Sequence, residues 1–302
     1  MATIASKVTK PAMPESSKEP VIPSQRSYAA LLNDLAGGPS RGGRRAGAAG
    51  RRIQTRRRLD HAALRNIRRL NLATTRIRVG ASCTSLALWY VDLDVTAEAL
   101  GCFMHWLSDD ELAKAECFQS ELHRARYLVG RAALRCVLAD QLGCSPAAIR
   151  LSYGRCGKPM LEGGWGHVDF SLAHSGGDAI IALAAGAAIG VDIELLRPIA
   201  DVESLARLVF SDAECRELEL ASDPVAAFLN GWTRKEAYVK ALGLGLTAPL
   251  REITVSLSGR AALFSTGLSD QSVSDWRLLN VPHRRAVVAL ALGPWLDGSR
   301  KT

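Results

Sequence analysis

The sequence predicts an α/β fold made of two similar halves, on three observations. Segments with the period-two alternation of strands and segments with helical spacing follow one another from about residue 84 to residue 292. The order strand, helices, strands occurs twice along this stretch, which is typical of α/β architecture. Hydrophobic residues make up 48% of the 302-residue chain, which is enough to form the cores of both halves.

Residues 1–80 differ in composition from the rest and are predicted to be a disordered basic extension. They hold 17 Lys and Arg against 4 Asp and Glu, whereas the remaining residues hold 21 against 26. Pro, Ser, Gly, Ala and Arg dominate, so this segment has too little apolar surface to offset the entropy of ordering it. A basic arm that docks an acidic partner or a nucleic acid is the alternative. The mildly acidic remainder means that the pI of 9.3 says little about the partners of the globular part.

The first half, residues 81–187, is expected to open with a strand at 84–93, where the apolar run TSLALWYVDL lies. A helix follows, with Ser108 as N-cap and Glu111 three positions on, which is the capping-box arrangement. Helical spacing then continues, as one broken helix or two successive helices, to Gly143. Further strands are expected near 149–153, 168–173 and 179–183, with a turn at 154–159.

The second half, residues 188–302, repeats this order. It is expected to begin with a strand at 188–196, followed by helices that start at Ser211 and Asp223. Ser211 and Glu214 form a second capping-box pattern, and Pro224 takes the first helical position after Asp223. Strands at 252–257, 276–280 and 286–291 complete this half.

Two acidic residues lie on one face of the strand predicted at 188–196. Apolar residues alternate there with Gly190, Asp192 and Glu194, and period two places the two carboxylates side by side. Neighbouring carboxylates repel each other, and together they suit a hard cation that takes oxygen ligands. A strand with one solvated face shows the same pattern, so the strand alone leaves both interpretations open.

The helix predicted to begin at Pro224 favours the metal interpretation. Its apolar stripe passes through Trp232, and the next position on that stripe is Glu236. A carboxylate on the inward side of a helix is costly unless it has a partner such as a cation. Lys240 follows at i+4 and reaches the same cleft, whereas Lys235 points about 100° away and is expected at its rim. An ordinary Glu–Lys helix pair is the alternative.

Candidate phosphate-binding residues lie in two further segments. In FSLAHSGG, His174 ends a predicted strand and precedes Ser175 and two glycines, which let the backbone approach a phosphate closely. In GRCGKPML, Lys158 precedes a proline that stiffens the turn. A histidine at the end of a strand is often only a surface or capping residue, so these two segments decide nothing by themselves.

Four of these motifs, in this order, resemble a known family. GVDIELLRP at 190–198 and WTRKEAYVKALGLGL at 232–246 resemble the two signature motifs of the 4'-phosphopantetheinyl transferases. GKP at 157–159 and FSLAHS at 170–175 resemble further motifs of the larger, surfactin-synthetase-activating type. The resemblance covers about residues 84–292. It implies a pseudo-twofold α/β fold in which residues 81–187 bind coenzyme A and residues 188–302 hold the metal and the catalytic groups.

The resemblance also implies a reaction and a role for each candidate residue. The 4'-phosphopantetheine group of coenzyme A would move to a serine of an apo acyl or peptidyl carrier protein, with release of 3',5'-ADP. Mg²⁺ would be held by Asp192, Glu194 and Glu236. Glu236, or a metal-bound water next to it, would help to remove the serine proton, and Lys240 would assist the leaving group. His174 is expected to act beside them. The residues expected to bind coenzyme A are His174, Ser175, Lys158, Lys235, Lys240, Arg131 and, as second choice to Arg131, Arg126.

The chain departs from the family pattern at two positions. Members of this type commonly read FNxSHS where this chain has Ser171 and Ala173. We interpret Ala173 as the loss of a hydrogen bond to a phosphate, which predicts coenzyme A binding weaker by about 1 to 2 kcal/mol.

A monomer is expected because one chain holds both halves. No apolar run reaches the roughly 20 residues of a membrane helix, and no signal peptide opens the chain, so a cytoplasmic protein without membrane or nucleic-acid partners is predicted. A Mg²⁺-dependent phosphodiesterase or nuclease is the rival enzyme, since it would also use converging carboxylates and the basic tail. A non-enzymatic adaptor is the other rival, but a binding module has no reason to bury three acids.

Overall fold

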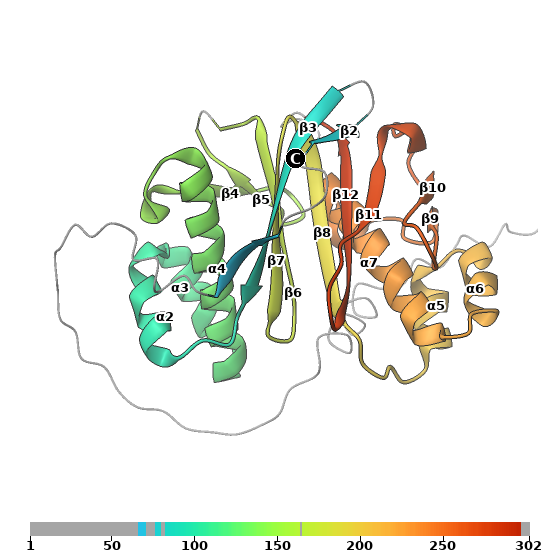
Figure 1. Cartoon of the computed structure of the whole chain (residues 1–302), viewed down its shortest axis with the longest axis horizontal. Helices are drawn as coiled ribbons and strands as arrows, with labels where there is room; N and C mark the ends of the chain where they lie inside the picture. The colour runs from blue at the N-terminus through green and yellow to red at the C-terminus, as the bar shows by residue number, and fades with distance from the viewer. Residues whose placement is uncertain (1–65, 71–75, 80–81, 164, 297–302) are drawn as a thin grey trace, which may run out of the picture.

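The computed structural model describes residues 66–70, 76–79, 82–163 and 165–296. The predicted disorder of the N-terminal extension falls largely outside these residues. Figure 1 shows four layers: helices of the first half, two β-sheets side by side, and helices of the second half. The mixed α/β architecture with two similar halves is therefore as predicted.

The first half contains an antiparallel sheet covered by helices. Its strands, in the order β1–β3–β7–β6 with β2 also paired to β3, are β1 (Ile67–Leu70), β2 (Arg76–Val79), β3 (Ser82–Asp92), β6 (Val168–Ser175) and β7 (Asp178–Ala185). Its helices are α2 (Ala97–Phe103), α3 (Asp109–Glu116) and α4 (Glu121–Leu142). A separate hairpin is formed by β4 (Leu151–Tyr153) and β5 (Pro159–Leu161).

The second half contains a smaller antiparallel sheet and its own helices. The strands, in the order β11–β12–β8, are β8 (Ala187–Leu195), β11 (Arg277–Asn280) and β12 (Ala286–Pro294). The helices are α5 (Val202–Val209), α6 (Asp212–Glu219) and α7 (Pro224–Leu242). A second small hairpin is formed by β9 (Ile253–Val255) and β10 (Leu263–Thr266). Short 3₁₀ helices occupy Met104–Trp106, Pro146–Ala148, Gly245–Thr247 and Val273–Asp275.

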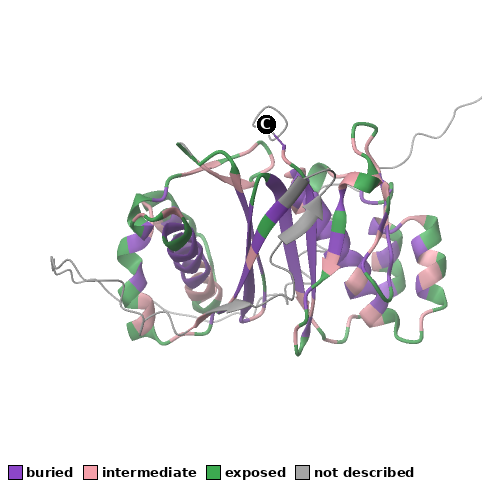
Figure 2. Cartoon of the chain, turned by 45° about the horizontal axis from the view of Figure 1, so that its top comes forward, coloured by how far each residue is buried: buried purple, intermediate pink, exposed green. Residues whose placement is uncertain are grey.

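Three apolar clusters fill the three interfaces between the four layers. One lies between the first sheet and α4 and includes Trp89 and Leu134. A second lies between the two sheets and includes Ile189 and Leu290, and a third packs α7 through Trp232 against the second sheet. Figure 2 shows the buried residues concentrated on the central strands, with exposed residues on the outer sides of the helices. The two halves therefore share a continuous interior, and the β8 strand lies within it.

The helix boundaries agree with the capping signals in the sequence. Ser108 with Glu111 and Ser211 with Glu214 form complete capping boxes at the starts of α3 and α6. The Asp223 side chain caps α7, and α4 and α7 end at glycines in the left-handed conformation, with φ of 69° and 73°. These predictions from local sequence are confirmed.

The start of the ordered region was predicted too late. Strands β1 and β2 both lie before residue 80 and both pair with β3. The segment RIRV of β2 alternates arginine with apolar residues, which is a period-two pattern. The average composition of residues 1–80 is strongly basic and predicts disorder, whereas the strand pattern occupies only a few residues at the end of this segment. Helices α2 and α5 and the short strands β5 and β10 were not predicted either.

Candidate active site

Strand β8 and helix α7 touch at Gly190, and this contact builds the site. A Cβ atom on Gly190 would lie 2.0 Å from the carbonyl oxygen of Ala237 and 2.4 Å from the backbone nitrogen of Ala241. Only glycine therefore allows this approach of helix to strand. Asp192 is two residues further along the same side of β8, so its carboxylate lies against the last turns of α7.

Lys240 of α7 forms an ion pair with Asp192. The distance between Lys240 Nζ and Asp192 Oδ1 is 2.5 Å. The other carboxylate oxygen, Oδ2, is buried and has no hydrogen-bond partner among the described residues. Asp192 is 6% exposed and Glu236 is 8% exposed. Asp192 and Lys240 are therefore in contact, and Glu236 lies one helical turn before Lys240 on the same side of α7.

The protonation equilibria of these groups are coupled through their charges. Burial raises the pKa of Asp192, although the ammonium of Lys240 opposes this. Burial, reinforced by the negative charge of Asp192, raises the pKa of Glu194 to about 8. Burial lowers the pKa of Lys240, but the charges of Asp192, Glu236 and Glu194 outweigh it and hold this pKa above its usual value. The acids thus lie where additional positive charge would be strongly favoured.

The carboxylates of Asp192, Glu194 and Glu236 are chemically suited to bind Mg²⁺, and the Lys240 ammonium neutralises the charge of Asp192 in this structure. Oxygen donors of carboxylates are the ligands that Mg²⁺ takes in proteins, and the buried Asp192 Oδ2 is such a donor without a partner. Across the part of the chain that the structure describes, however, no three His, Cys, Asp or Glu side chains already converge as metal ligands. Metal binding would therefore require Lys240 to release Asp192 and the carboxylates to close in.

A cavity of about 360 Å³ opens beside this group and is walled by both halves. The lining residues come from α3, α4, the β4–β5 hairpin, β6, α7 and the 243–246 segment, and those with polar or aromatic side chains are Lys114, Tyr127, Arg131, Tyr153, Lys158, Phe170, Ser171, Glu236 and Lys240. Because Glu236 and Lys240 belong to this wall, the cavity and the acidic group form one site.

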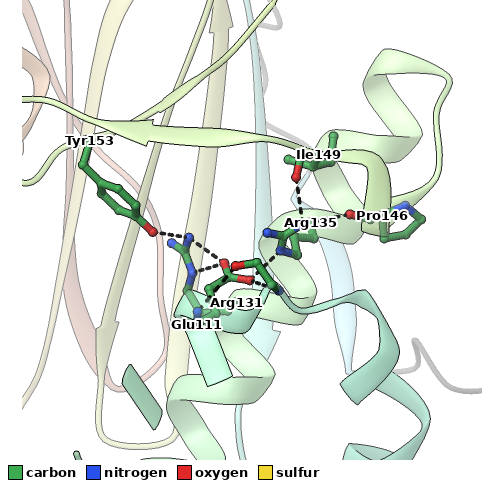
Figure 3. A network of polar contacts seen from close by, with 7 residues as sticks. Glu111, Arg131, Arg135, Pro146, Ile149 and Tyr153 are labelled. Carbon is green, nitrogen blue, oxygen red and sulfur yellow. Dashed lines mark hydrogen bonds and ion pairs between the residues drawn. The ribbon is translucent and has the colours of Figure 1, made fainter. Parts of the chain in front are cut away.

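Arg131 lines the cavity and is held there by a buried ion-pair network (Figure 3). Glu111 accepts hydrogen bonds from Arg131 Nε at 2.7 Å and Arg135 Nε at 2.6 Å. A second nitrogen of Arg131 donates to the hydroxyl of Tyr153 at 3.0 Å. The capping residue Glu111 thus also fixes the arginine that we predicted to bind phosphate. Its second role was missed, because its partners lie 20 and 24 residues away in sequence.

Lys114 and Tyr127 are cavity residues that the sequence did not reveal. The Lys114 ammonium lies 5.8 Å from the centre of the Tyr127 ring. A lysine in the last turn of a short helix carries no motif, so only the packing of α3 on α4 places it beside the cavity.

Lys158 is one of the cavity residues, but its ammonium forms hydrogen bonds within the protein. Nζ donates to Asp169 Oδ2 at 2.7 Å and to the backbone oxygens of Ile189 and Ala241, both at 3.1 Å. An ammonium has three N–H donors, and these three acceptors use all of them. The predicted contact of Lys158 with a phosphate is therefore not supported, and Lys158 instead ties β6, β8 and α7 together.

Lys235 lies on the far side of α7 and is fully buried, not at the rim of the cleft. Nζ lies 2.7 Å from Glu214 Oε2 and donates to the backbone oxygens of Val209 at 2.8 Å and Leu250 at 2.6 Å. Burial lowers the pKa of Lys235 to about 8, although Glu214 opposes the shift. The expected place of Lys235 at the rim is wrong, because a turn of 100° from Glu236 carries its side chain into the core of the second half. The predicted contact of Lys235 with coenzyme A is therefore not supported.

Arg126 also has another partner. Its guanidinium is bonded to both carboxylate oxygens of Asp94, at 2.7 and 3.0 Å, and it is not among the cavity residues. His174 lies on the side of β6 that faces α4, and its ring is exposed. Desolvation first, and then the charges of Lys240, His123 and Arg126, lower the pKa of His174. His174 thus lies within the electrostatic reach of Lys240, as expected, while Arg126 does not contact the cavity.

Ser175 and Ala173 point toward β8 rather than toward the cavity. Ser175 Oγ accepts from the backbone nitrogen of Leu195 at 3.1 Å and donates to Glu194 Oε2 at 3.0 Å. Ala173 is buried in the cluster between the two sheets. The prediction that the missing Ala173 hydroxyl removes a phosphate contact is therefore not supported, because this side chain faces the interior.

Comparison with known proteins identifies the family. Residues 188–291 match the model of the 4'-phosphopantetheinyl transferase superfamily. The 4'-phosphopantetheinyl transferase HetI of Nostoc sp. is 36% identical over 210 residues, which cover 68% of this chain and 86% of HetI. This chain belongs to the 4'-phosphopantetheinyl transferase superfamily.

One more relative and one solved structure are similar to parts of this chain. The transferase Sfp of Bacillus subtilis is 31% identical over 171 residues, covering 56% of this chain and 74% of Sfp. A solved structure, holo-[acyl-carrier-protein] synthase (AcpS) of Thermotoga maritima, aligns with a TM-score of 0.28 and 20% identity over 36% of this chain and 64% of that chain. The transferase described here is an enzyme that moves the phosphopantetheine group of coenzyme A to a carrier protein. The matched region 188–291 contains Asp192, Glu194, Glu236 and Lys240.

Proposed function

We propose that this transferase acts with Mg²⁺ held by Asp192, Glu194 and Glu236, at the wall of the cavity that receives coenzyme A. The observation that carries the proposal is the buried Asp192 Oδ2, which has no hydrogen-bond partner within the described part of the chain and lies beside the Lys240 ammonium. The raised pKa values of Asp192 and Glu194 support it, because such acids gain most from a divalent cation. When bound, the ion would neutralise the pyrophosphate of coenzyme A and polarise its phosphorus for attack.

Two residues of α7 would then serve the chemistry. Glu236, which lines the cavity, would accept the proton of the carrier serine hydroxyl as that oxygen attacks the β-phosphorus. Lys240, released from Asp192, would donate hydrogen bonds to the leaving 3',5'-ADP as its charge develops. Both roles need side chains from the same face of the helix, and the i to i+4 spacing provides them.

The phosphates of coenzyme A would be held by polar and basic side chains of the first half. Arg131 is fixed at the cavity wall by Glu111 and Tyr153, so little conformational entropy is lost when it binds an anion. Lys114 also lines the cavity, and His174 lies close enough to Lys240 that the charge of Lys240, after desolvation, helps to lower the pKa of His174. These three replace the set that contained Lys158, Lys235 and Arg126.

The enzyme is proposed to work as a monomer in the cytoplasm. The cavity walls come from both halves of one chain, which supports a complete site without a second copy. Within the described part of the chain, even the longest helices lack the apolar length that a membrane crossing requires. Sedimentation of the purified protein, alone and with a carrier protein, tests the oligomeric state.

The test of the proposed chemistry is intact-mass analysis of an apo carrier protein. Incubation with the enzyme, coenzyme A and Mg²⁺ is expected to add one phosphopantetheine group, and Glu236→Gln is expected to reduce the rate by at least about 100-fold. Glu203→Gln, on the exposed side of α5, is the matched control and is expected to behave as wild type. Full transfer by Glu236→Gln would falsify the assigned role. Cleavage of coenzyme A without any carrier would support the rival phosphodiesterase.

A further inference from the structure

Strands β6 and β8 are joined by side chains rather than by a backbone ladder. They are the neighbouring edges of the two sheets, and within the described strands each sheet ends there. Alternate side chains of β6 accept hydrogen bonds from β8: Asp169 Oδ2 from Ile189 N at 2.9 Å, Ser171 Oγ from Val191 N at 3.1 Å, and Ser175 Oγ from Leu195 N at 3.1 Å. We call this row of contacts the β6–β8 seam.

The contacts of the seam are regularly spaced along both strands. Each contact joins residues 20 positions apart, so the two strands run parallel and in constant register. The other side of β8 pairs with β12, so the N–H groups of the buried Ile189 and Val191 and of the half-buried Leu195 would otherwise lack acceptors within the protein. Buried backbone donors without partners are costly, and the seam satisfies these three.

One position of the seam is open, and it lies beside the acids. Ala173 takes the place between Ser171 and Ser175, and its methyl group offers no acceptor to Ile193. The row of contacts is therefore interrupted at the position next to the two strand acids, between the contacts of Ser171 and Ser175.

Ser175 contacts the other acid of the strand directly. Its hydroxyl oxygen accepts from Leu195 N and its hydrogen goes to Glu194 Oε2, so one side chain fixes both the strand and the carboxylate. Ser171 accepts from Val191 N in the same way, but none of the hydrogen bonds among the described residues joins it to an acid. Ser175 therefore combines a seam contact with a contact to an acid, which Ser171 does not.

The lower end of the seam is anchored to the helix that carries Glu236. Asp169 binds the ammonium of Lys158, which also donates to the backbone of Ile189 on β8 and of Ala241 on α7. The strand that carries Asp192 and Glu194 is therefore fixed at one end to α7 and along its length to β6. A shift of β8 along its own axis would break these contacts together.

We propose that the β6–β8 seam sets the positions of the two strand acids, and that Ser175 is the positioning residue for Glu194. This inference rests on the proposed metal site. Without the hydroxyl of Ser175, Glu194 loses the hydrogen bond that orients Oε2, and β8 loses one support next to it. Divalent-ion binding should weaken, because the carboxylate must then be ordered when the ion binds.

The test compares Ser175→Ala, Ser175→Thr and Thr84→Val by titration with Mn²⁺ under saturating coenzyme A, followed by electron paramagnetic resonance. Ser175→Ala is expected to weaken Mn²⁺ binding about 10-fold, the effect of losing one hydrogen bond to a charged group. Ser175→Thr keeps the hydroxyl and should stay within about threefold of wild type. Thr84→Val removes a hydrogen bond to the backbone oxygen of Ala185 within the first sheet, at a residue that is neither in the seam nor among the cavity residues. It should lower the melting temperature as Ser175→Ala does, with Mn²⁺ affinity within about threefold of wild type.

Two further outcomes separate this inference from the proposed function. If Asp192→Asn abolishes Mn²⁺ binding while Ser175→Ala binds as wild type, the metal site stands and the positioning role of Ser175 is refuted. Equal weakening by Thr84→Val and Ser175→Ala would likewise overturn it, since the effect would then belong to a general loss of stability. If wild type binds no Mn²⁺, or Asp192→Asn binds it normally, both the metal site and this inference are wrong.

Discussion

Helix α7 carries two lysines, and each forms a short ion pair with a carboxylate, at 2.7 Å for Lys235 and 2.5 Å for Lys240. The two pairs differ in how far they are buried and in whether all their hydrogen-bonding groups have partners. Lys235 and its partner Glu214 are 0% and 1% exposed as side chains, and two backbone carbonyls take the remaining donors of Lys235. The Lys240 side chain is 33% exposed, and its partner Asp192 keeps one oxygen without a partner among the described residues. The first pair is complete, whereas the second leaves capacity for a ligand.

The difference between the two pairs follows from their positions around the helix. Lys240 follows Lys235 by five positions, which places the two side chains about 140° apart around the helix axis. One side faces the core formed with α5, α6 and β9, and the other faces β8 and the cavity. A lysine–carboxylate pair is therefore structural on one side of the helix and available for catalysis on the other. The two pairs differ in whether every donor and acceptor already has a hydrogen-bond partner among the described residues.

The largest effect is expected from breaking the complete pair. Lys235→Met leaves Glu214 buried without its cation, and the free energy of unfolding should fall by about 3 to 5 kcal/mol. Guanidinium unfolding measures this value. The double variant Lys235→Met/Glu214→Gln should lose less than the sum of the two single variants, since the orphaned charge is then removed. A loss below about 1 kcal/mol for Lys235→Met would contradict the assignment of this pair as structural.

Breaking the second pair should affect the reaction instead. Lys240→Met is expected to lower the transfer rate about 100- to 1000-fold, as for the loss of a donor to a developing charge. Its unfolding free energy should change by less than about 1 kcal/mol, because Lys240 is partly solvated and Asp192 can take up a proton. Intact-mass kinetics with a carrier protein measure the rate. Arg207→Met, in an exposed ion pair of α5, is the control. Wild-type transfer by Lys240→Met would remove the functional distinction between the two lysines.

The smallest effect concerns pH and the acids beside Lys240. In the folded protein the pKa of Glu194 is raised to about 8 from an ordinary value of 4.5, so the folded state holds this proton more tightly than the unfolded chain does. Stability should therefore fall as pH rises from about 4.5 and level off above about 8. Glu194→Gln removes this contribution, and without metal it should melt about 4 °C above wild type at pH 8.5.

Calorimetry from pH 5 to pH 9 follows this difference. At pH 5 the two proteins should melt at similar temperatures, because Glu194 is protonated in the folded state there. Added Mg²⁺ should raise the melting temperature of wild type more than that of Glu194→Gln. Parallel melting curves for the two proteins at every pH would show that Glu194 does not carry the raised pKa.

Much of the fold was predictable because its signals are local. The serines that cap α3 and α6, and the glycines that end α4 and α7, act within a few residues of themselves. The alternation in β8 and the apolar stripe of α7 were equally visible, so Asp192 and Glu236 were expected on facing elements. The predictions that depended on composition averaged over a long segment, such as the boundary at residue 80, were the weaker ones.

The sequence by itself determined which elements form, which acids face inward and which family the motifs resemble. These properties depend on neighbours within one or two turns, where periodicity and capping chemistry act. Only the tertiary structure decided which cations remain available for a substrate. Lys158 and Lys235 are saturated by carboxylates and carbonyls from distant segments, while Arg131 is held at the cavity by Glu111. Hydrogen bonds between residues far apart in sequence decide this, and no local pattern records them.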